Sequence, residues 1–121
     1  MMEIANVYTA QGEPLPGGGE HKTVLKSGDR LRCLYYKVPY RPEKDAMDGV
    51  HPHPVEGVIF VIDGEVEVNV AGESTILKKG DAMLVPVDAV MGTKVLSSMS
   101  AETFIVTTLP NTSHESHKTE E

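Results

Sequence analysis

The 121-residue sequence is poor in several residue types, and each shortage excludes a class of protein. It contains no tryptophan and only 5% aromatic residues, so we expect a core built mainly from valine, isoleucine, leucine and methionine. The single cysteine, Cys33, excludes an intrachain disulfide framework and suits a reducing compartment. Because no apolar run reaches the length of a signal core or a membrane span, we expect a cytoplasmic protein without a membrane partner.

Basic residues are also scarce. Eleven lysines and arginines stand against 18 acidic residues, which gives a net charge of -7. Nucleic acids and anionic membranes are bound by clustered positive charge, and the basic residues here are scattered, so we expect neither as a partner. At this length and with 40% hydrophobic residues, the chain is long enough for one domain with one core and too short for two.

The regular spacing of turn residues predicts an all-β fold. Gly64, Gly72 and Gly80 recur every eight residues, each beside an acidic residue. Residues 65–70 alternate polar side chains with valines, as in a strand that is buried on one face. No helical period of 3.6 residues extends far enough to indicate a helix. We therefore expect a sandwich or barrel of short strands.

The composition divides the chain into three parts. Residues 1–20 are rich in glycine and proline and form an N-terminal arm rather than a core element. Residues 21–109 form the β domain, in which the polar segment 39–49 is a surface loop. Residues 110–121 have no apolar side chain to bury, so they form a solvated tail unless they pack on a neighbouring subunit.

The most informative stretch of the sequence is residues 49–68. It contains His51 and His53, and side chains two positions apart on an extended segment point to the same face. Pro52 and Pro54 keep this segment out of a helix. Two imidazoles on one face can supply two of the ligands of a metal site.

This stretch resembles the first motif of the cupin superfamily, in which HxH is followed by three or four residues, a glutamate, six further residues and a glycine. Residues 80–92 resemble the second motif, because Gly80 and Pro86 stand where the family places a glycine and a proline. The resemblance implies an all-β jelly-roll barrel, the cupin double-stranded β-helix. It also implies a metal held by two histidines and a glutamate from the first motif and one histidine from the second.

Four positions of this sequence depart from the family motifs. The glutamate position falls on Gly57, and the histidine position of the second motif falls on Met91. Asp88 replaces a glycine of the second motif, and Asp45 replaces the glycine that opens the first. We therefore expect at most a weakly bound divalent metal (Zn, Mn, Ni or Fe) at low occupancy, with His51 and His53 as tentative ligands. Glu56 becomes a third ligand only if a β-bulge shifts the register by one residue.

Our first functional hypothesis is a protein that binds a small polar or carboxylate-bearing molecule inside the barrel, and it assigns no catalytic residue. The proposed ligand-binding residues are His51, His53, Tyr36 and Met91. Four residues lie on one predicted strand, alternate in facing and can supply one or two polar contacts to a bound acid or sugar: Tyr35, Tyr36, Arg30 and Arg32.

Two other hypotheses come from different classes of protein. The resemblance implies a metal-dependent enzyme of the dioxygenase, lyase or sugar isomerase type, or a metal-free epimerase-like enzyme. In the latter, one histidine acts as general base and is oriented by a carboxylate such as Glu56 or Asp88. The third hypothesis is a dimerisation module whose pocket is too small for a ligand.

We also expect a homodimer in which the N-terminal arm crosses to the partner. Val58, Phe60 and Ile62 share one face of a predicted strand, and a lone small barrel would expose this apolar face to water.

Overall fold

The computed structural model describes residues 2–16, 18–41, 48–52 and 55–108, and every regular element in these ranges is a β-strand. The strands are β1 (Glu13–Pro14), β2 (Glu20–Ser27), β3 (Leu31–Pro39), β4 (Asp48–Pro52), β5 (Gly57–Asp63), β6 (Glu65–Val70), β7 (Glu73–Lys78), β8 (Ala82–Val85), β9 (Val90–Val95) and β10 (Ser100–Thr108). The prediction of an all-β fold is confirmed. None of the described segments is a helix of the length and apolarity that a membrane span requires.

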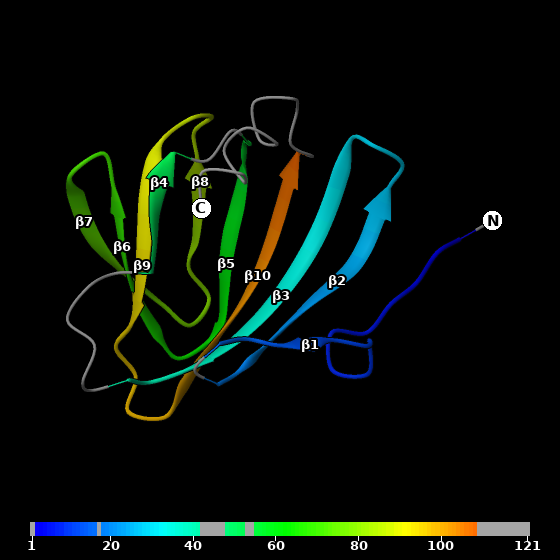
Figure 1. Ribbon diagram of the computed structural model, residues 1–121, viewed down its shortest axis with the longest axis horizontal. Helices are drawn as coiled ribbons and strands as arrows, with labels where there is room; N and C mark the ends of the chain where they lie inside the picture. Colours follow the sequence, from blue (N-terminus) through cyan, green and yellow to red (C-terminus); the bar gives the residue numbers. More distant parts are fainter. Residues whose placement is uncertain (1, 17, 42–47, 53–54, 109–121) are drawn as a thin grey trace.

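The strands form two antiparallel sheets. The larger sheet has the order β1, β2, β3, β10, β5, β8, and the smaller one has the order β4, β9, β6, β7. Figure 1 shows the smaller sheet to the left and strands β5, β10, β3 and β2 to the right, with the N-terminal arm extending beyond β2. Neighbours in each sheet are mostly distant in sequence, and this is the jelly-roll arrangement that the motifs predicted.

The core lies between the two sheets and is aliphatic. In β6, Val66 and Val68 are 5% and 0% exposed, which confirms the prediction from the alternation in residues 65–70. They pack with buried side chains from both sheets, namely Ile59, Val61, Leu77, Val85 and Ala101. Met83 and Met91 are partly buried against this cluster. The core is therefore built from the residue types that the composition predicted.

The three predicted turn glycines lie in the successive turns from β5 to β6, from β6 to β7 and from β7 to β8. Gly64, Gly72 and Gly80 have φ values of 85°, 89° and 92°, a backbone region in which a side chain is strained. Asp88, which stands at a glycine position of the family motif, has a φ of 60°. Aspartate tolerates this left-handed conformation better than most residues, so the departure at this position leaves the turn intact.

The N-terminal arm packs on the outer face of the larger sheet. The Lys22 ammonium in β2 donates hydrogen bonds to the carbonyls of Val7 (2.7 Å) and Tyr8 (3.2 Å). The Tyr8 ring meets the ring of Tyr35 edge to face, with 6.0 Å between their centroids. Farther along, β1 pairs with β2, so Glu13 lies opposite His21. Within this single chain the arm thus contacts its own barrel.

An apolar patch also lies on the outer face, on β5 and β8. It consists of Val58, Phe60 and Leu84, which are 39%, 40% and 66% exposed, and we call it the outer apolar patch. Val58 and Phe60 alternate with the buried Ile59 and Val61, as the sequence predicted. Ile62, which we also expected on this face, is partly buried.

Candidate functional site

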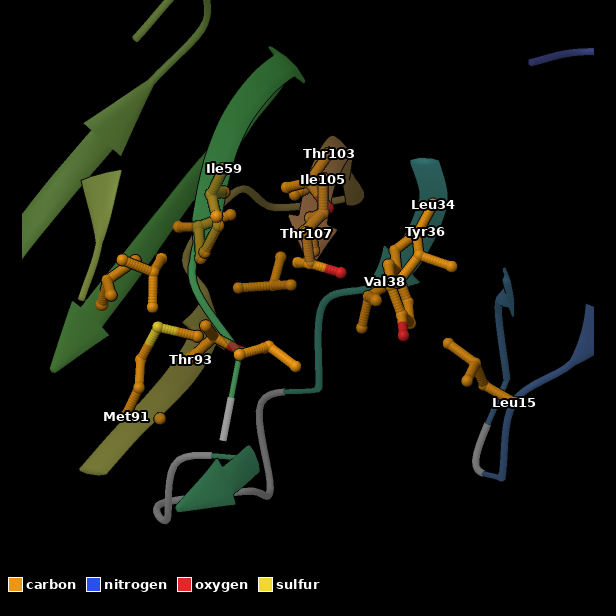
Figure 2. Close-up of a pocket in the computed structure, with 18 of the residues that line it drawn as sticks. Leu15, Leu34, Tyr36, Val38, Ile59, Met91, Thr93, Thr103, Ile105 and Thr107 are labelled. Atoms are coloured by element: carbon orange, nitrogen blue, oxygen red, sulfur yellow. The ribbon is translucent and has the colours of Figure 1, made fainter. Parts of the chain in front are cut away.

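The two sheets enclose a cavity of about 520 Å³. Figure 2 shows side chains from β3, β5, β9 and β10 directed into it, with Leu15 of the arm at one side. Most of the wall is aliphatic and includes Leu34, Val38, Val55, Ile59, Val66, Val68, Val85, Val95, Ala101 and Ile105. A pocket of this volume and character is typical of small-molecule sites. A pocket too small for a ligand would have supported the dimerisation-module hypothesis, and a cavity of this volume gives no such support.

Most polar side chains of the described cavity wall lie on one side, formed by β3 and β10. Strand alternation directs Arg32, Leu34 and Tyr36 to the same face, and the antiparallel register places Thr107 opposite Arg32 and Thr103 opposite Tyr36. The wall therefore carries two polar rows, which are separated by the apolar pair Leu34 and Ile105.

Arg32 brings a positive charge to this wall. Its Nε donates a long hydrogen bond of 3.4 Å to the Thr107 hydroxyl. Within the described ranges the cavity wall contains no aspartate or glutamate, and neither of the two ion pairs found there involves Arg32. A guanidinium has five N–H donors, so Arg32 keeps donors for a further acceptor.

Tyr36, a predicted ligand-binding residue, lies on the same wall. Burial raises the pKa of the Tyr36 phenol, and the opposing effect of the Arg32 charge is smaller. The phenol is therefore protonated at neutral pH and acts as a hydrogen-bond donor. The Tyr36 ring also stacks on the ring of His21, its partner in β2, with 5.9 Å between centroids.

The hairpin that joins β1 and β2 forms part of the cavity wall at one side. Leu15 and Pro16 of this hairpin line the cavity. The Arg41 guanidinium, which follows β3, donates hydrogen bonds from Nη2 to the carbonyls of Pro16 (3.1 Å) and Gly18 (3.2 Å). We expected residues 1–20 to form an arm outside the core and did not predict that Leu15 and Pro16 line the cavity. The apolar Leu15 within a run of glycines and prolines was the available signal.

The two positions that the family motifs give to a glutamate and a histidine both lie at the cavity. Gly57 and Met91 line it, so the alignment of both motifs places residues where the resemblance implied. A Cβ atom on Gly57, however, would lie 2.2 Å from the Val106 carbonyl oxygen and 2.8 Å from the Thr107 methyl group. No larger side chain fits there unless β5 and β10 move apart.

These two positions do not fit a divalent first-row metal. Gly57 supplies no donor atom, and Met91 supplies only a soft thioether, which suits Cu(I). Among the described residues no three histidine, cysteine, aspartate or glutamate side chains come together as a metal site. The described part of the chain thus offers neither the carboxylate nor the second-motif histidine of the family's metal site.

The remaining predicted residues have different outcomes. The backbone of His51 in β4 pairs with Met91 in β9, whereas the side chains of β4 and the whole of His53 lie outside the described part of the chain. Glu56 is exposed, while its neighbours Val55 and Gly57 line the cavity. The register shift of β5 lies at the other end of the strand, opposite Glu102 and Thr103, so no bulge turns Glu56 inward.

Asp88, the other carboxylate that we considered for orienting a histidine, also lies outside the cavity. Asp88 is exposed in the turn before β9 and does not line the cavity. Neither Glu56 nor Asp88 therefore lies on the described cavity wall.

Comparison with known proteins agrees with this architecture. A model of the cupin domain family matches residues 40–107, which is more than half of the chain. No curated protein sequence matches the chain significantly.

Three similar solved structures cover nearly the whole chain. They are KdgF from Halomonas sp. (18% identity, TM-score 0.77, 94% of this chain and 99% of that chain), TT1209 from Thermus thermophilus (25%, 0.73, 91% and 100%) and an RmlC-like cupin from Shewanella frigidimarina (20%, 0.71, 94% and 96%). At these identities the likeness concerns the fold. With the family model, the shared fold and both motifs in place, the chain belongs to the cupin family.

Proposed function

We propose that this protein binds a small carboxylate-bearing molecule in the cavity between its two sheets. The observation that carries the proposal is Arg32, a cation in a largely apolar cavity whose described wall contains no acidic residue. The chain as a whole carries a net charge of -7, so a positive charge in its cavity is a local feature that favours an anionic ligand.

The chemistry of the wall supports a carboxylate in particular. A guanidinium binds a carboxylate through paired N–H donors, and such charge-assisted hydrogen bonds are about twice as strong as neutral ones. The Tyr36 phenol and the Thr107 hydroxyl lie on the same wall and supply further hydrogen bonds. The aliphatic side chains around them exclude water and strengthen the electrostatic attraction.

Met91 offers apolar contact surface at the other wall of the cavity. That His51 and His53 supply additional donors stays a prediction, because their side chains lie outside the described part of the chain. A divalent metal binds there weakly at most, because positions 57 and 91 offer no fitting ligand.

Thermal unfolding with a panel of small acids tests the proposal. The panel contains plain and hydroxylated carboxylic acids, each paired with its neutral amide. A ligand at 100 times its Kd adds about 2.7 kcal/mol of stability and raises the Tm by several degrees. We expect some acids to raise the Tm while their amides do not.

Two matched variants locate the effect. Arg32→Met removes the cavity charge, whereas Arg30→Met removes a charge from an exposed position two residues away. Stabilisation should disappear in Arg32→Met and persist in Arg30→Met. Equal stabilisation by acids and amides, or by acids in both variants, would contradict the proposal.

A further inference from the structure

We infer that the ligand is an apolar carboxylic acid, with an aliphatic or alicyclic body that carries few or no hydroxyl groups, rather than a sugar acid. This inference rests on the proposed function and adds the chemical class of the ligand's body. The observation behind it is the unequal distribution of polar groups over the cavity wall.

The polar groups that can hold the carboxylate lie on one side. Arg32 and Tyr36 are four residues apart on β3, a Cα separation of about 13 Å. Both line the cavity, on either side of Leu34, and the Arg32 guanidinium lies beside the Thr107 hydroxyl. A carboxylate that Arg32 binds at this wall directs its attached carbon body toward the opposite wall.

The part of the opposite wall that β6 and β9 form offers few partners to a hydroxyl group. Strands β6 and β9 contribute Val66, Val68, Met91 and Val95, and Val68 is fully buried. Thr93 supplies the one side-chain hydroxyl of these two strands at the described wall. An aliphatic body fits this surface because contact removes apolar area from water on both sides.

The remaining polar side chains of the described wall leave the distribution of polar groups unequal. Arg41 already donates two hydrogen bonds to carbonyls of the hairpin between β1 and β2. Thr103 lies on the carboxylate side, opposite Tyr36 in the register. A sugar acid would bury several hydroxyls with few partners, and each unpaired hydroxyl should lower the affinity by roughly tenfold.

The volume of the cavity agrees with a ligand of modest size. About 520 Å³ equals the liquid volume of roughly 15 to 20 water molecules. An acid with a six-carbon chain or ring therefore fits within the cavity together with its carboxylate.

Calorimetric titration of the full chain with two matched pairs of acids tests the inference. The pairs are hexanoate against gluconate, and cyclohexanecarboxylate against quinate, so the carbon framework and the charge stay constant while hydroxyls are added. We expect each plain acid to bind at least tenfold more tightly than its hydroxylated counterpart. We also expect Arg32→Met to weaken binding of the plain acids by about 10- to 100-fold, and Arg30→Met to leave it within about twofold.

The outcomes separate this inference from the proposed function. If gluconate or quinate binds as tightly as its plain counterpart, or more tightly, and depends on Arg32, the ligand's body is polar and the inference is wrong while the proposed function stands. If none of the four acids binds, or if binding is the same in Arg32→Met, both are wrong. Tighter binding of the plain acids through Arg32 supports both.

Discussion

Replacing Gly57 with alanine should destabilise the barrel far more than its small size suggests. The new methyl carbon would lie 2.2 Å from the Val106 carbonyl oxygen, about 1 Å inside ordinary contact. Strand β5 would have to move away from β10 at this point. The hydrogen bonds between Glu56 and Thr108, of 2.9 and 3.0 Å, lie directly beside it and would be weakened.

The magnitude follows from these contacts. Overpacking in a tight site costs about 1–3 kcal/mol, and weakening the neighbouring hydrogen bonds costs about 1 kcal/mol more. Alanine regains about 0.5–1 kcal/mol, because glycine loses more backbone entropy in a strand. We therefore expect Gly57→Ala to lower the free energy of unfolding by about 2 kcal/mol or more. Glu56→Ala, one residue away and exposed, should stay within about 0.5 kcal/mol of the natural protein.

Urea unfolding followed by far-UV circular dichroism measures this difference, since the chain has no tryptophan to report on it. With a slope of about 2 kcal/mol per molar urea, the midpoint of Gly57→Ala should fall by about 1 M. A midpoint within about 0.2 M of the natural protein would refute the reasoning. Position 57 would then have room for a ligand side chain, as in cupins that hold a metal.

Three further predictions concern other parts of the molecule. We expect a homodimer formed through the outer apolar patch, and light scattering that gives the mass of one chain at micromolar concentration would contradict it. Elemental analysis of protein purified without a chelator or a nickel column should find no stoichiometric first-row metal; a stoichiometric metal would show that His51 and His53 recruit ligands that we have not identified. Burial, together with the hydrogen bond that Tyr35 donates to Glu102, raises the pKa of Tyr35 above 10.0. Its contribution to stability is therefore complete below pH 10 and is lost as the pH rises above it, so Tyr35→Phe should flatten the fall of the urea midpoint above about pH 10. An unchanged alkaline slope would show that Tyr35 is not the group responsible.

The strands and the core were predictable because they depend on local patterns. Alternation in residues 65–70 identified a half-buried strand, and Gly64, Gly72 and Gly80 marked turns that only a positive φ can close. The two motifs also placed positions 57 and 91 correctly at the cavity, because motif spacing fixes where a residue lies along adjoining strands.

The chemistry of the cavity was less predictable because it depends on contacts between distant segments. Arg32 was recognisable as a candidate contact, but the absence of an acidic residue from the described wall became visible only once β3 was paired with β10. Leu15 likewise lines the cavity in a hairpin that accepts hydrogen bonds from Arg41, and these contacts join residues more than twenty positions apart. The close approach at Gly57 is a matter of distance between strands, which no sequence pattern reports.

A crystal structure of the protein with bound hexanoate is the most direct test of the central claim, that Arg32 anchors a carboxylate inside the barrel. We predict density for the acid between the two sheets, with its carboxylate oxygens about 2.7–2.9 Å from guanidinium nitrogens of Arg32. The carbon chain should lie against the valines of β6 and β9. Hexanoate bound only outside the barrel, or inside it with its carboxylate directed away from Arg32, would contradict the account.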